Sequence, residues 1–277
     1  MANPNLQLLT DAARLLEPIL GELVFVGGCA TALLITDNAA ADVRPTFDVD
    51  AIAEITSYAA YAEFSDRLRK LGFREDASES APVCRWRQKT TTLDVMPLDE
   101  TILGFSNTWY RPAMDHAEER NLEKGLKIRL VAPVYFCASK LEAFAGRGKN
   151  DFHASRDLED LIAVVDGRAE LAGGIRSAAG DVRSYLAKEI KKLTSSREFN
   201  DALPGHLPPD AASETSRGVS YCGSATVWKT YTSPDLMRTH LRRSREGSHV
   251  RSYLDNKSVF RWSRNWAARD LQIAFLQ

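Results

Sequence analysis

The stretch "RPTFDVDAI", residues 44–52, places two aspartates two positions apart in an otherwise apolar run with high β propensity. Side chains alternate between the two faces of a strand, so Asp48 and Asp50 are expected to point to the same side. Two like charges side by side on a strand repel each other and add nothing to its stability. The pair therefore calls for a functional explanation, and a hard divalent cation shared by both carboxylates would supply one.

A glycine pair precedes these aspartates by about 20 residues. The run "ELVFVGG", residues 22–28, is a short apolar strand that ends at Gly27 and Gly28, and a helical segment, "CATALLITD", follows. At such a junction backbone N–H groups converge and the helix dipole favours an anion. Glycine also lets the main chain approach a phosphate closely. The geometry of a tight strand-to-helix turn is the alternative reason for glycine here.

A third acid lies on a later strand. In "TTLDVMP", residues 91–97, Asp94 is the lone acid among β-forming residues, and it faces away from Leu93 and Val95. A carboxylate from a neighbouring strand would complete a metal site with the upstream pair. The alternative is three solvated acids on an exposed sheet face. Convergence of the three carboxyl groups beside the glycine turn would favour the metal site.

The spacing of apolar residues predicts the elements around these motifs. We expect helices over residues 5–20, 29–37, 57–72, 131–148, 155–167 and 181–196, and strands over residues 22–28, 46–55, 82–88 and 91–97. The prolines of residues 203–210 are expected to end the helical part. This order predicts an α+β fold, in which a small mixed β-sheet flanked by helices is followed by a mainly helical C-terminal portion.

The bulk composition excludes several classes of protein. Apolar residues make up 44% and charged residues 26% of the 277 residues, as in soluble globular proteins. No apolar run approaches the roughly 18 residues of a membrane span. The N-terminus has no basic segment before its apolar positions, so we do not expect a signal peptide. The four cysteines are far apart without C-x-x-C spacing, which indicates reduced thiols in a cytoplasmic protein.

The chain changes character near residue 210. Residues 211–277 contain 11 Lys and Arg against 5 Asp and Glu, whereas residues 1–210 contain 25 against 32. Trp228, Trp262 and Trp266 lie among the basic residues. Arginine interleaved with aromatic residues can bind single-stranded RNA by charge and stacking. A poorly ordered extension and a rearranged reading frame are the alternatives.

Taken as a set, these motifs resemble the DNA polymerase β-type nucleotidyltransferase superfamily. Within it, "VGGCATALLITD", "RPTFDVDAI" and "TTLDVMP" are similar to the AbiEii-type branch of toxin-like nucleotidyltransferases, which includes the MenT toxins. The stretch "ASKLEAFAGRGKNDFHASRDLEDL", residues 138–161, also fits that branch, which places a lysine on one helix and an R-D or D-x-x-D element on the next. The resemblance covers about residues 20–210.

The resemblance implies a role for each acid and for one lysine. Asp48, Asp50 and Asp94 would be the metal ligands and catalytic acids, holding Mg²⁺ or Mn²⁺ that bridges the triphosphate of an NTP. Asp94 would also orient or deprotonate the attacking group. Lys140 would be a catalytic and nucleotide-binding residue that stabilises charge on the phosphates. Its alternative is a solvent-facing lysine on an amphipathic helix.

Other residues are implied to bind the nucleotide. Gly27, Gly28, Cys29 and Thr46 form this group, and Arg147 is a second cation that could serve the same purpose as Lys140. Cys29 stands where many superfamily members have serine, so we expect backbone N–H groups rather than its side chain to contact phosphate.

The helix after Lys140 carries two acids that the resemblance does not rank firmly. We choose Asp157 over Asp160 as the catalytic residue. Either acid would orient Lys140 by an ion pair, or would simply pair with Arg156 on its own helix. His153 has no partner visible in the sequence and is interpreted as structural or on the surface.

The resemblance also implies the domain organisation and the activity. Residues 1–130 would form the catalytic core, residues 131–210 a helical portion that completes the site, and residues 211–277 the basic extension. The reaction would move an NMP from an NTP to an acceptor, tRNA or a protein, with release of pyrophosphate. The setting would be a toxin–antitoxin or phage-defence system, with a cognate antitoxin as a partner and no membrane.

Two alternatives remain open. One is a catalytically silent relative that binds nucleotide or RNA as a regulatory module. The other is an aminoglycoside-type nucleotidyltransferase acting on a small molecule, which would need an acidic, concave acceptor pocket.

Overall fold

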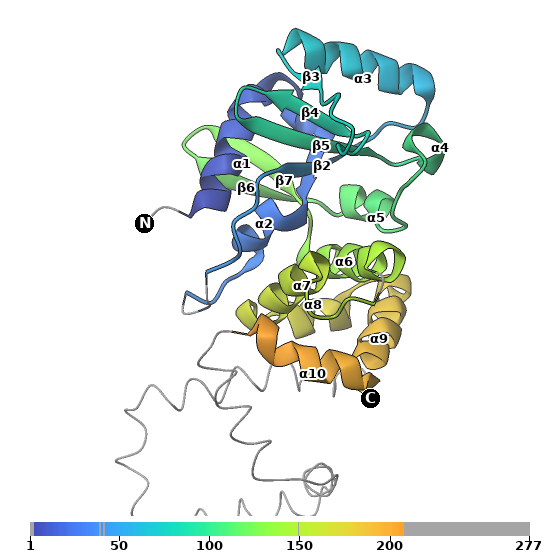
Figure 1. Cartoon of the computed structure of the whole chain (residues 1–277). Coiled ribbons are helices and arrows are strands. Elements are labelled where there is room, and N and C mark those ends of the chain that lie inside the picture. The colour runs from blue at the N-terminus through green and yellow to red at the C-terminus, as the bar shows by residue number, and fades with distance from the viewer. Residues whose placement is uncertain (1–2, 39, 41, 149, 208–277) are drawn as a thin grey trace, which may run out of the picture.

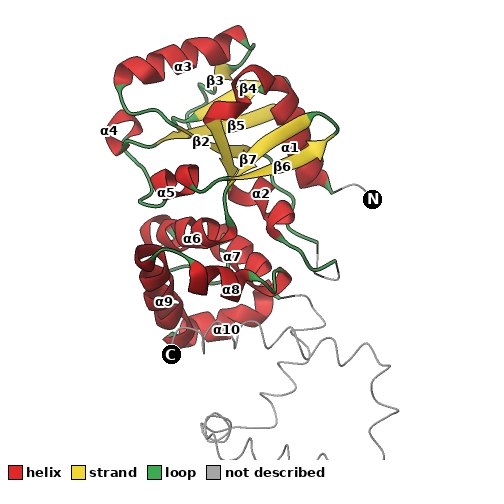
Figure 2. Cartoon of the chain, turned by 180° about the vertical axis from the view of Figure 1, so that it is seen from behind, coloured by secondary structure: helices red, strands yellow, loops and turns green. Residues whose placement is uncertain are grey.

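The computed structural model describes residues 3–207, except residues 39, 41 and 149. A seven-stranded sheet forms the upper part of the molecule in Figure 1, and a group of helices packs below it. Figure 2 shows the same two parts from behind. The predicted α+β fold, a mixed sheet flanked by helices and followed by a mainly helical portion, is confirmed for this part of the chain. The basic stretch of residues 211–277 lies outside the described residues.

The sheet has the strand order β3-β4-β5-β2-β1-β7-β6. The strands are β1 Leu23–Val26, β2 Val49–Ala53, β3 Arg74–Glu75, β4 Arg85–Gln88, β5 Thr91–Pro97, β6 Glu118–Glu123 and β7 Leu126–Leu130. β2 runs parallel to β5 and antiparallel to β1, while β1 runs parallel to β7. The pairs β3–β4, β4–β5 and β6–β7 are antiparallel. The mixed sheet thus places the two strands that carry the acids side by side at its centre.

The helices follow the chain order of the sequence prediction, with several additions. They are α1 Pro4–Leu15, the 3₁₀-helix η1 Glu17–Glu22, α2 Gly27–Leu34, α3 Tyr58–Lys70, α4 Glu100–Leu103, α5 Tyr110–Asp115, α6 Pro133–Arg147, α7 Arg156–Gly167, α8 Leu171–Ser177, α9 Gly180–Ser195 and α10 Arg197–His206. α1 contacts strands β2, β5, β6 and β7, and α6 contacts α5, α7, α8 and α9.

One short helix joins the two parts. α2 contacts β1 and β2 on the sheet and α6 and α7 in the helical part. Its residues Cys29, Ala30 and Leu34 are fully buried, because small and branched apolar side chains fill the space between the sheet and the helices. A residue at the start of α2 therefore lies within reach of both the central strands and α7.

Some predicted boundaries are wrong for identifiable reasons. The strand expected over 46–55 begins at Val49, because Thr46 makes side-chain and backbone bonds instead of joining the ladder. The helix expected over 5–20 ends at Leu15 and gives way to a 3₁₀ turn around Pro18, which cannot continue an α-helix. Gly27 and Gly28, expected at the end of a strand, form the first turn of α2.

Several elements were not predicted. They include β3, the hairpin β6–β7, and the short helices α4 and α5. α10 also continues through Pro204, where the prolines were expected to end the helical part. One proline near the C-terminal end of a helix removes only a single backbone bond, which the packing of the buried Phe199 and Ala202 can offset.

None of the described helices combines the length and the apolar character that crossing a membrane requires. The three cysteines within the described residues, Cys29, Cys84 and Cys137, are buried free thiols.

Candidate active site

The segment before β2 is held in place by a buried amide. Asn5 is fully buried in α1; its Nδ2 donates to the Arg44 carbonyl at 2.9 Å, and its Oδ1 accepts from the Thr46 backbone N–H at 2.9 Å. Thr46 Oγ1 in turn donates to Asp48 Oδ1 at 2.8 Å. One side chain at the N-terminus of the chain thus fixes the backbone that presents Asp48.

Replacing Asn5 with alanine should loosen this segment. The substitution removes both bonds of a buried amide and leaves a partly buried carbonyl and a partly buried N–H without these partners, which costs about 2 kcal/mol and lowers Tm by about 5 °C. Gln7→Ala on the same helix is the matched control, since Gln7 is exposed and bonds only Asp11. Thermal melts in which the two variants lower Tm equally would contradict the role of Asn5 in holding the segment before β2.

Asp50 lies against the glycine turn. Gly27 has φ +70°, and a Cβ added to it would fall 1.9 Å from Asp50 Oδ2. Only glycine therefore allows both the left-handed backbone and the close approach of the carboxylate. Asp50 also sits directly beside Asp94 in the parallel register of β2 and β5.

Asp48 and Asp94 share a guanidinium group. Arg85 Nη2 donates to Asp48 Oδ2 and to Asp94 Oδ2, each at 2.7 Å, and Arg85 Nε donates to Asp94 Oδ1 at 2.8 Å. The side chain of Asp94 is 8% exposed and that of Asp48 is 32% exposed. The structure thus brings the three acids together beside Gly27 and Gly28, and Asp94 is not on an exposed sheet face.

Burial and charge together set the ionisation of Asp50. Removal from water, and then the negative charge of Asp48, raises the pKa of the Asp50 carboxyl to about 7, against the opposing effect of Lys140. A carboxylate crowded in this way is stabilised by any cation that comes near it.

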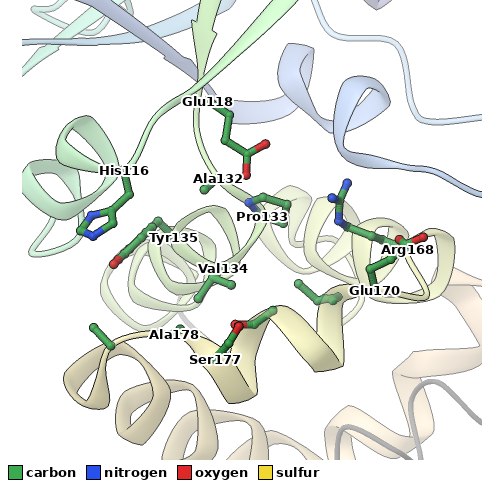
Figure 3. A pocket seen from close by; sticks show the side chains of 13 residues that line it. His116, Glu118, Ala132, Pro133, Val134, Tyr135, Arg168, Glu170, Ser177 and Ala178 are labelled. Carbon is green, nitrogen blue, oxygen red and sulfur yellow. The ribbon is translucent and has the colours of Figure 1, made fainter.

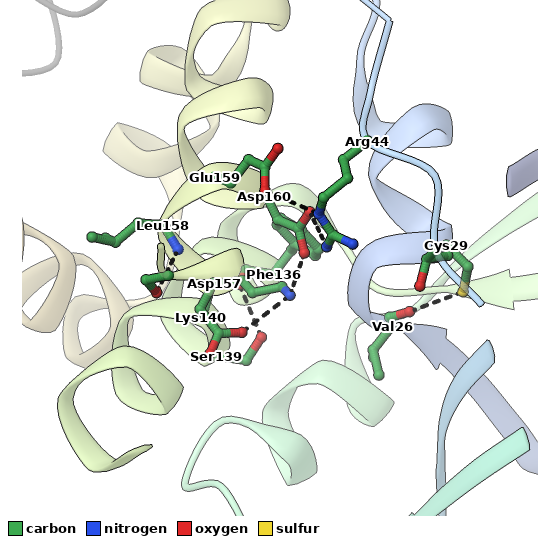
Figure 4. Close-up of polar contacts among 12 residues, drawn as sticks. Val26, Cys29, Arg44, Phe136, Ser139, Lys140, Asp157, Leu158, Glu159 and Asp160 are labelled. Carbon is green, nitrogen blue, oxygen red and sulfur yellow. Dashed lines mark hydrogen bonds and ion pairs between the residues drawn. The ribbon is translucent and has the colours of Figure 1, made fainter. Parts of the chain in front are cut away.

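Lys140 on α6 supplies one such charge from the helical part (Figure 4). It is 8% exposed, and its Nζ donates to Asp160 Oδ2 at 2.6 Å and to Asp157 Oδ1 at 3.2 Å. Burial lowers its pKa, but Asp160 and then Asp157 more than offset this, so the net pKa is raised and the amine stays charged. Lys140 is therefore not a solvent-facing lysine.

Both acids of α7 contact Lys140, and each has a second cationic partner. Arg147 Nε and Nη2 bond the two oxygens of Asp157 at 3.0 and 2.9 Å. Arg44 reaches Asp160 Oδ1 at 3.5 Å and Glu159 at 3.0 Å (Figure 4). Neither acid pairs with a residue of its own helix in these contacts, and both contact Lys140, because one turn of α7 presents both.

The same network reaches the second glycine of the turn. A Cβ added at Gly28 would lie 3.4 Å from Asp160 Oδ2, 3.6 Å from Arg44 Nη2 and 3.6 Å from Thr46 Oγ1. The first two residues of α2 thus lie between the two groups of charges: Gly27 is next to Asp50 of the sheet, and Gly28 is near Asp160 of α7.

The side chain of Cys29 does not contribute to this surface. It is fully buried, and its Sγ donates to the Val26 carbonyl at 3.4 Å. Burial also raises the pKa of the thiol, so it remains neutral. Any contact of Cys29 with an anion would have to come from its backbone N–H, as expected from the sequence.

The three carboxylates are ligands that suit a hard cation, but their side chains are not arranged around a common metal position. Within the described residues no group of three or more His, Cys, Asp or Glu side chains is positioned to hold a metal ion. Arg85 lies between Asp48 and Asp94, and Asp50 points toward Gly27. The chemistry of three carboxylates, one of them poorly compensated, nevertheless fits Mg²⁺ or Mn²⁺.

The sequence did not draw attention to two arginines of this site. Arg85 was part of a predicted strand without a role, and Arg44 part of a loop. The signal for Arg85 was available, because a two-residue turn at Lys89 and Thr90 pairs Arg85 with Asp94 across the hairpin. Arg44 meets its partners on α7 across 115 residues, and no local pattern indicates that contact.

A cavity of about 560 Å³ lies elsewhere (Figure 3). It is lined by His116, Glu118, the start of α6, and residues of α8, and contains none of the residues predicted for the site. Figure 3 shows these side chains between the end of the β6–β7 hairpin and α8.

Solved structures include chains that are similar to this one. No family model matches the chain, and no curated protein matches it. The crystal structure of an antigenic nucleotidyltransferase-like protein from Paracoccidioides brasiliensis is similar to this chain, with 18% sequence identity and a TM-score of 0.45. The similarity covers 73% of this chain and 94% of that one.

Proposed function

We propose that the chain is a metal-dependent nucleotidyltransferase that moves an NMP from an NTP to an acceptor and releases pyrophosphate. One observation carries the proposal: Asp50 and Asp94 on the adjacent strands β2 and β5, and Asp48 just before β2, lie near one another beside a glycine turn at the start of a helix. Three carboxylates this close repel one another, and a metal-bound triphosphate would offset that repulsion.

In the proposed mechanism Asp48, Asp50 and Asp94 would hold Mg²⁺ or Mn²⁺, whose charge when bound would offset that of the triphosphate. The backbone N–H groups of Gly28 and Cys29 at the start of α2 donate hydrogen bonds to phosphate oxygens. An acceptor oxygen forms a bond to the α-phosphorus, and the bond from that phosphorus to the bridging oxygen of pyrophosphate breaks.

The chain's own charged side chains complete the mechanism. Lys140, held by Asp157 and Asp160, places a positive charge near Asp50 and favours the leaving pyrophosphate. Asp94 takes the proton of the acceptor once its oxygens are released from Arg85. Arg147 binds the nucleotide from its exposed position at the end of α6.

An exposed aromatic residue beside the acids supports a base-containing substrate. Phe47 is 82% exposed, although its neighbours Thr46 and Asp48 are fixed by hydrogen bonds. An aromatic ring presented to solvent next to the acids suits stacking on a nucleobase. We propose tRNA or another protein as the acceptor, a toxin–antitoxin or phage-defence setting with a cognate antitoxin, and a cytoplasmic location. These finer assignments follow from the sequence resemblance.

A second candidate is the silent relative that binds nucleotide without transferring it. The contact that favours it is the guanidinium of Arg85, which occupies both oxygens of Asp94. The small-molecule alternative has no such support. An acidic cavity of about 470 Å³, lined by Asp99, Glu100 and Glu142, lies past the far ends of β2 and β5. Thr56 at that cavity follows the end of β2, and none of the three acids lines the cavity.

The proposal is tested by the fate of two labels. We expect the full chain with Mg²⁺ to transfer label from an NTP labelled at the α-phosphate to tRNA or protein, and to release label from an NTP labelled at the γ-phosphate as pyrophosphate. EDTA should stop both. Transfer of the γ-label would indicate a kinase, and binding of NTP without any transfer would favour the silent relative.

A further inference from the structure

Arg85 is the one cation in contact with two of the three acids among the residues that the structure describes. We propose that Arg85 is a built-in counter-ion, which holds Asp48 and Asp94 together before metal binds and must leave Asp94 for the metal to enter. The inference rests on the proposed function, since it concerns how the same acids receive their divalent cation.

The contacts of Arg85 leave few oxygens for another cation. Its Nε and Nη2 take both oxygens of Asp94 at 2.8 and 2.7 Å, and Nη2 also takes Asp48 Oδ2 at 2.7 Å. The remaining oxygen of Asp48 accepts from Thr46. A divalent cation bound to Asp48 and Asp94 would lie within a few ångströms of the guanidinium, and the two positive charges would repel each other.

The position of Arg85 is set by the hairpin rather than by chance contact. Arg85 and Asp94 are paired residues in the register of β4 and β5. The next residue, Trp86, is 1% exposed and anchors the strand in the core. The backbone of Arg85 is therefore fixed, and only its side chain can move. That side chain is 21% exposed, so it has a path toward solvent.

The charge of Arg85 persists under all ordinary conditions. The bond to Asp94 raises the pKa of the guanidinium above its already high ordinary value. Only displacement can remove it, because deprotonation does not occur. The metal must therefore compete with Arg85, and the freed guanidinium would then face the negatively charged substrate.

Competition predicts opposite effects on two measurements. Without Arg85 the acids repel each other, so the metal-free protein becomes less stable. The same acids should then bind a divalent cation more tightly. A residue that merely supports the site would act differently, because its loss would weaken both stability and metal binding.

The test is a titration of the full chain with Mn²⁺ alone, without nucleotide, followed by free Mn²⁺ in electron paramagnetic resonance. We expect Arg85→Gln to lower Kd for Mn²⁺ by about tenfold or more and to lower Tm in the absence of metal. Arg87→Gln is the matched control, since Arg87 lies two residues on in the same strand and pairs with Asp76 instead. Its Kd should equal that of the wild type.

Arg85→Lys covers the case in which the glutamine variant does not fold. Lysine keeps the charge but lacks the planar guanidinium that bonds both oxygens of Asp94. The Kd of Arg85→Lys for Mn²⁺ should therefore lie between that of the wild type and that of Arg85→Gln. Equal or weaker Mn²⁺ binding by a folded Arg85 variant, with a wild type that does bind Mn²⁺, would overturn the inference and leave the proposed function standing. Absence of Mn²⁺ binding in the wild type and in every variant would overturn both.

Discussion

Replacing Asp50 with asparagine is expected to abolish nucleotide transfer and, at the same time, to raise Tm at pH 8. Transfer should fall by about 10³-fold or more, because a metal ligand beside the triphosphate is lost. Stability should rise because the wild-type carboxylate is held in the site at a cost, as its pKa of about 7 shows. The gain is about 1–2 kcal/mol after solvent screening, or a few degrees in Tm.

The gain in stability should depend on pH in a defined direction. The ordinary pKa of an aspartate is 3.8, and the pKa of Asp50 in the folded protein is about 7. A raised pKa means that the folded state holds the proton more tightly, so wild-type stability falls as pH rises between these values. The difference between Asp50→Asn and the wild type should therefore be small at pH 4 and complete above pH 7.

Thermal melts of both proteins without metal, from pH 4 to pH 8, check this prediction. Asp66→Asn is the matched control, since the side chain of Asp66 is 66% exposed on α3 and pairs only with Arg69. A variant at Asp50 that is less stable than the wild type at pH 8 would show that the carboxylate is well compensated, contrary to our account.

Replacing Lys140 with methionine should produce the largest loss of stability. Methionine keeps the length of the side chain but removes the charge that Asp157 and Asp160 share. Breaking a buried ion pair by removing one partner costs about 3–5 kcal/mol, because the other charge stays buried. Tm should therefore fall by about 10 °C. Arg147 still pairs with Asp157 and Arg44 with Asp160 in this variant, so the loss of stability should not exceed this range.

Thermal melts at pH 7.5 with Lys188→Met as the control separate this effect from a general effect of losing a lysine. The side chain of Lys188 is 80% exposed on α9, so its loss should change Tm by less than about 2 °C. Similar melts for the two variants would show that the Lys140 ion pairs contribute nothing measurable to the fold.

The local parts of the site could be predicted from the sequence. Alternation along the strand separated Asp94 from Leu93 and Val95, and the glycine pair marked the turn at which Asp50 now lies. These predictions depend on residues close together in the chain, whose geometry follows from the strand and the turn themselves. The same was true of the helix that carries Lys140, which was expected over residues 131–148 and extends from Pro133 to Arg147.

The parts that were missed depend on contacts between distant segments. Asn5 meets Arg44 across 39 residues, and Arg44 meets Glu159 across 115. No local pattern indicates such contacts, because they arise when α1, α2 and α7 pack together. The choice of Asp157 over Asp160 was limited in the same way, since only the packing of α6 against α7 shows that both acids reach Lys140.

The hairpin β6–β7 was missed although its signal was local. Leu126, Ile128 and Leu130 alternate with Lys127 and Arg129, as in a half-buried strand. A glycine with positive φ, Gly125, precedes them and allows the turn. Many charged residues around this alternation obscured it, and they suit β6, which is an edge strand of the sheet.

The central claim is that Asp48, Asp50 and Asp94 carry out nucleotide transfer, and the most direct test uses Asp48. The full chain and its Asp48→Ala variant should be incubated with each NTP labelled at the α-phosphate and Mg²⁺, with and without tRNA. Asp48 is partly exposed, so the variant should keep the fold, as circular dichroism can check. We expect label on an acceptor with the wild type and at least 10³-fold less with the variant. Label transfer that survives in Asp48→Ala would contradict the account.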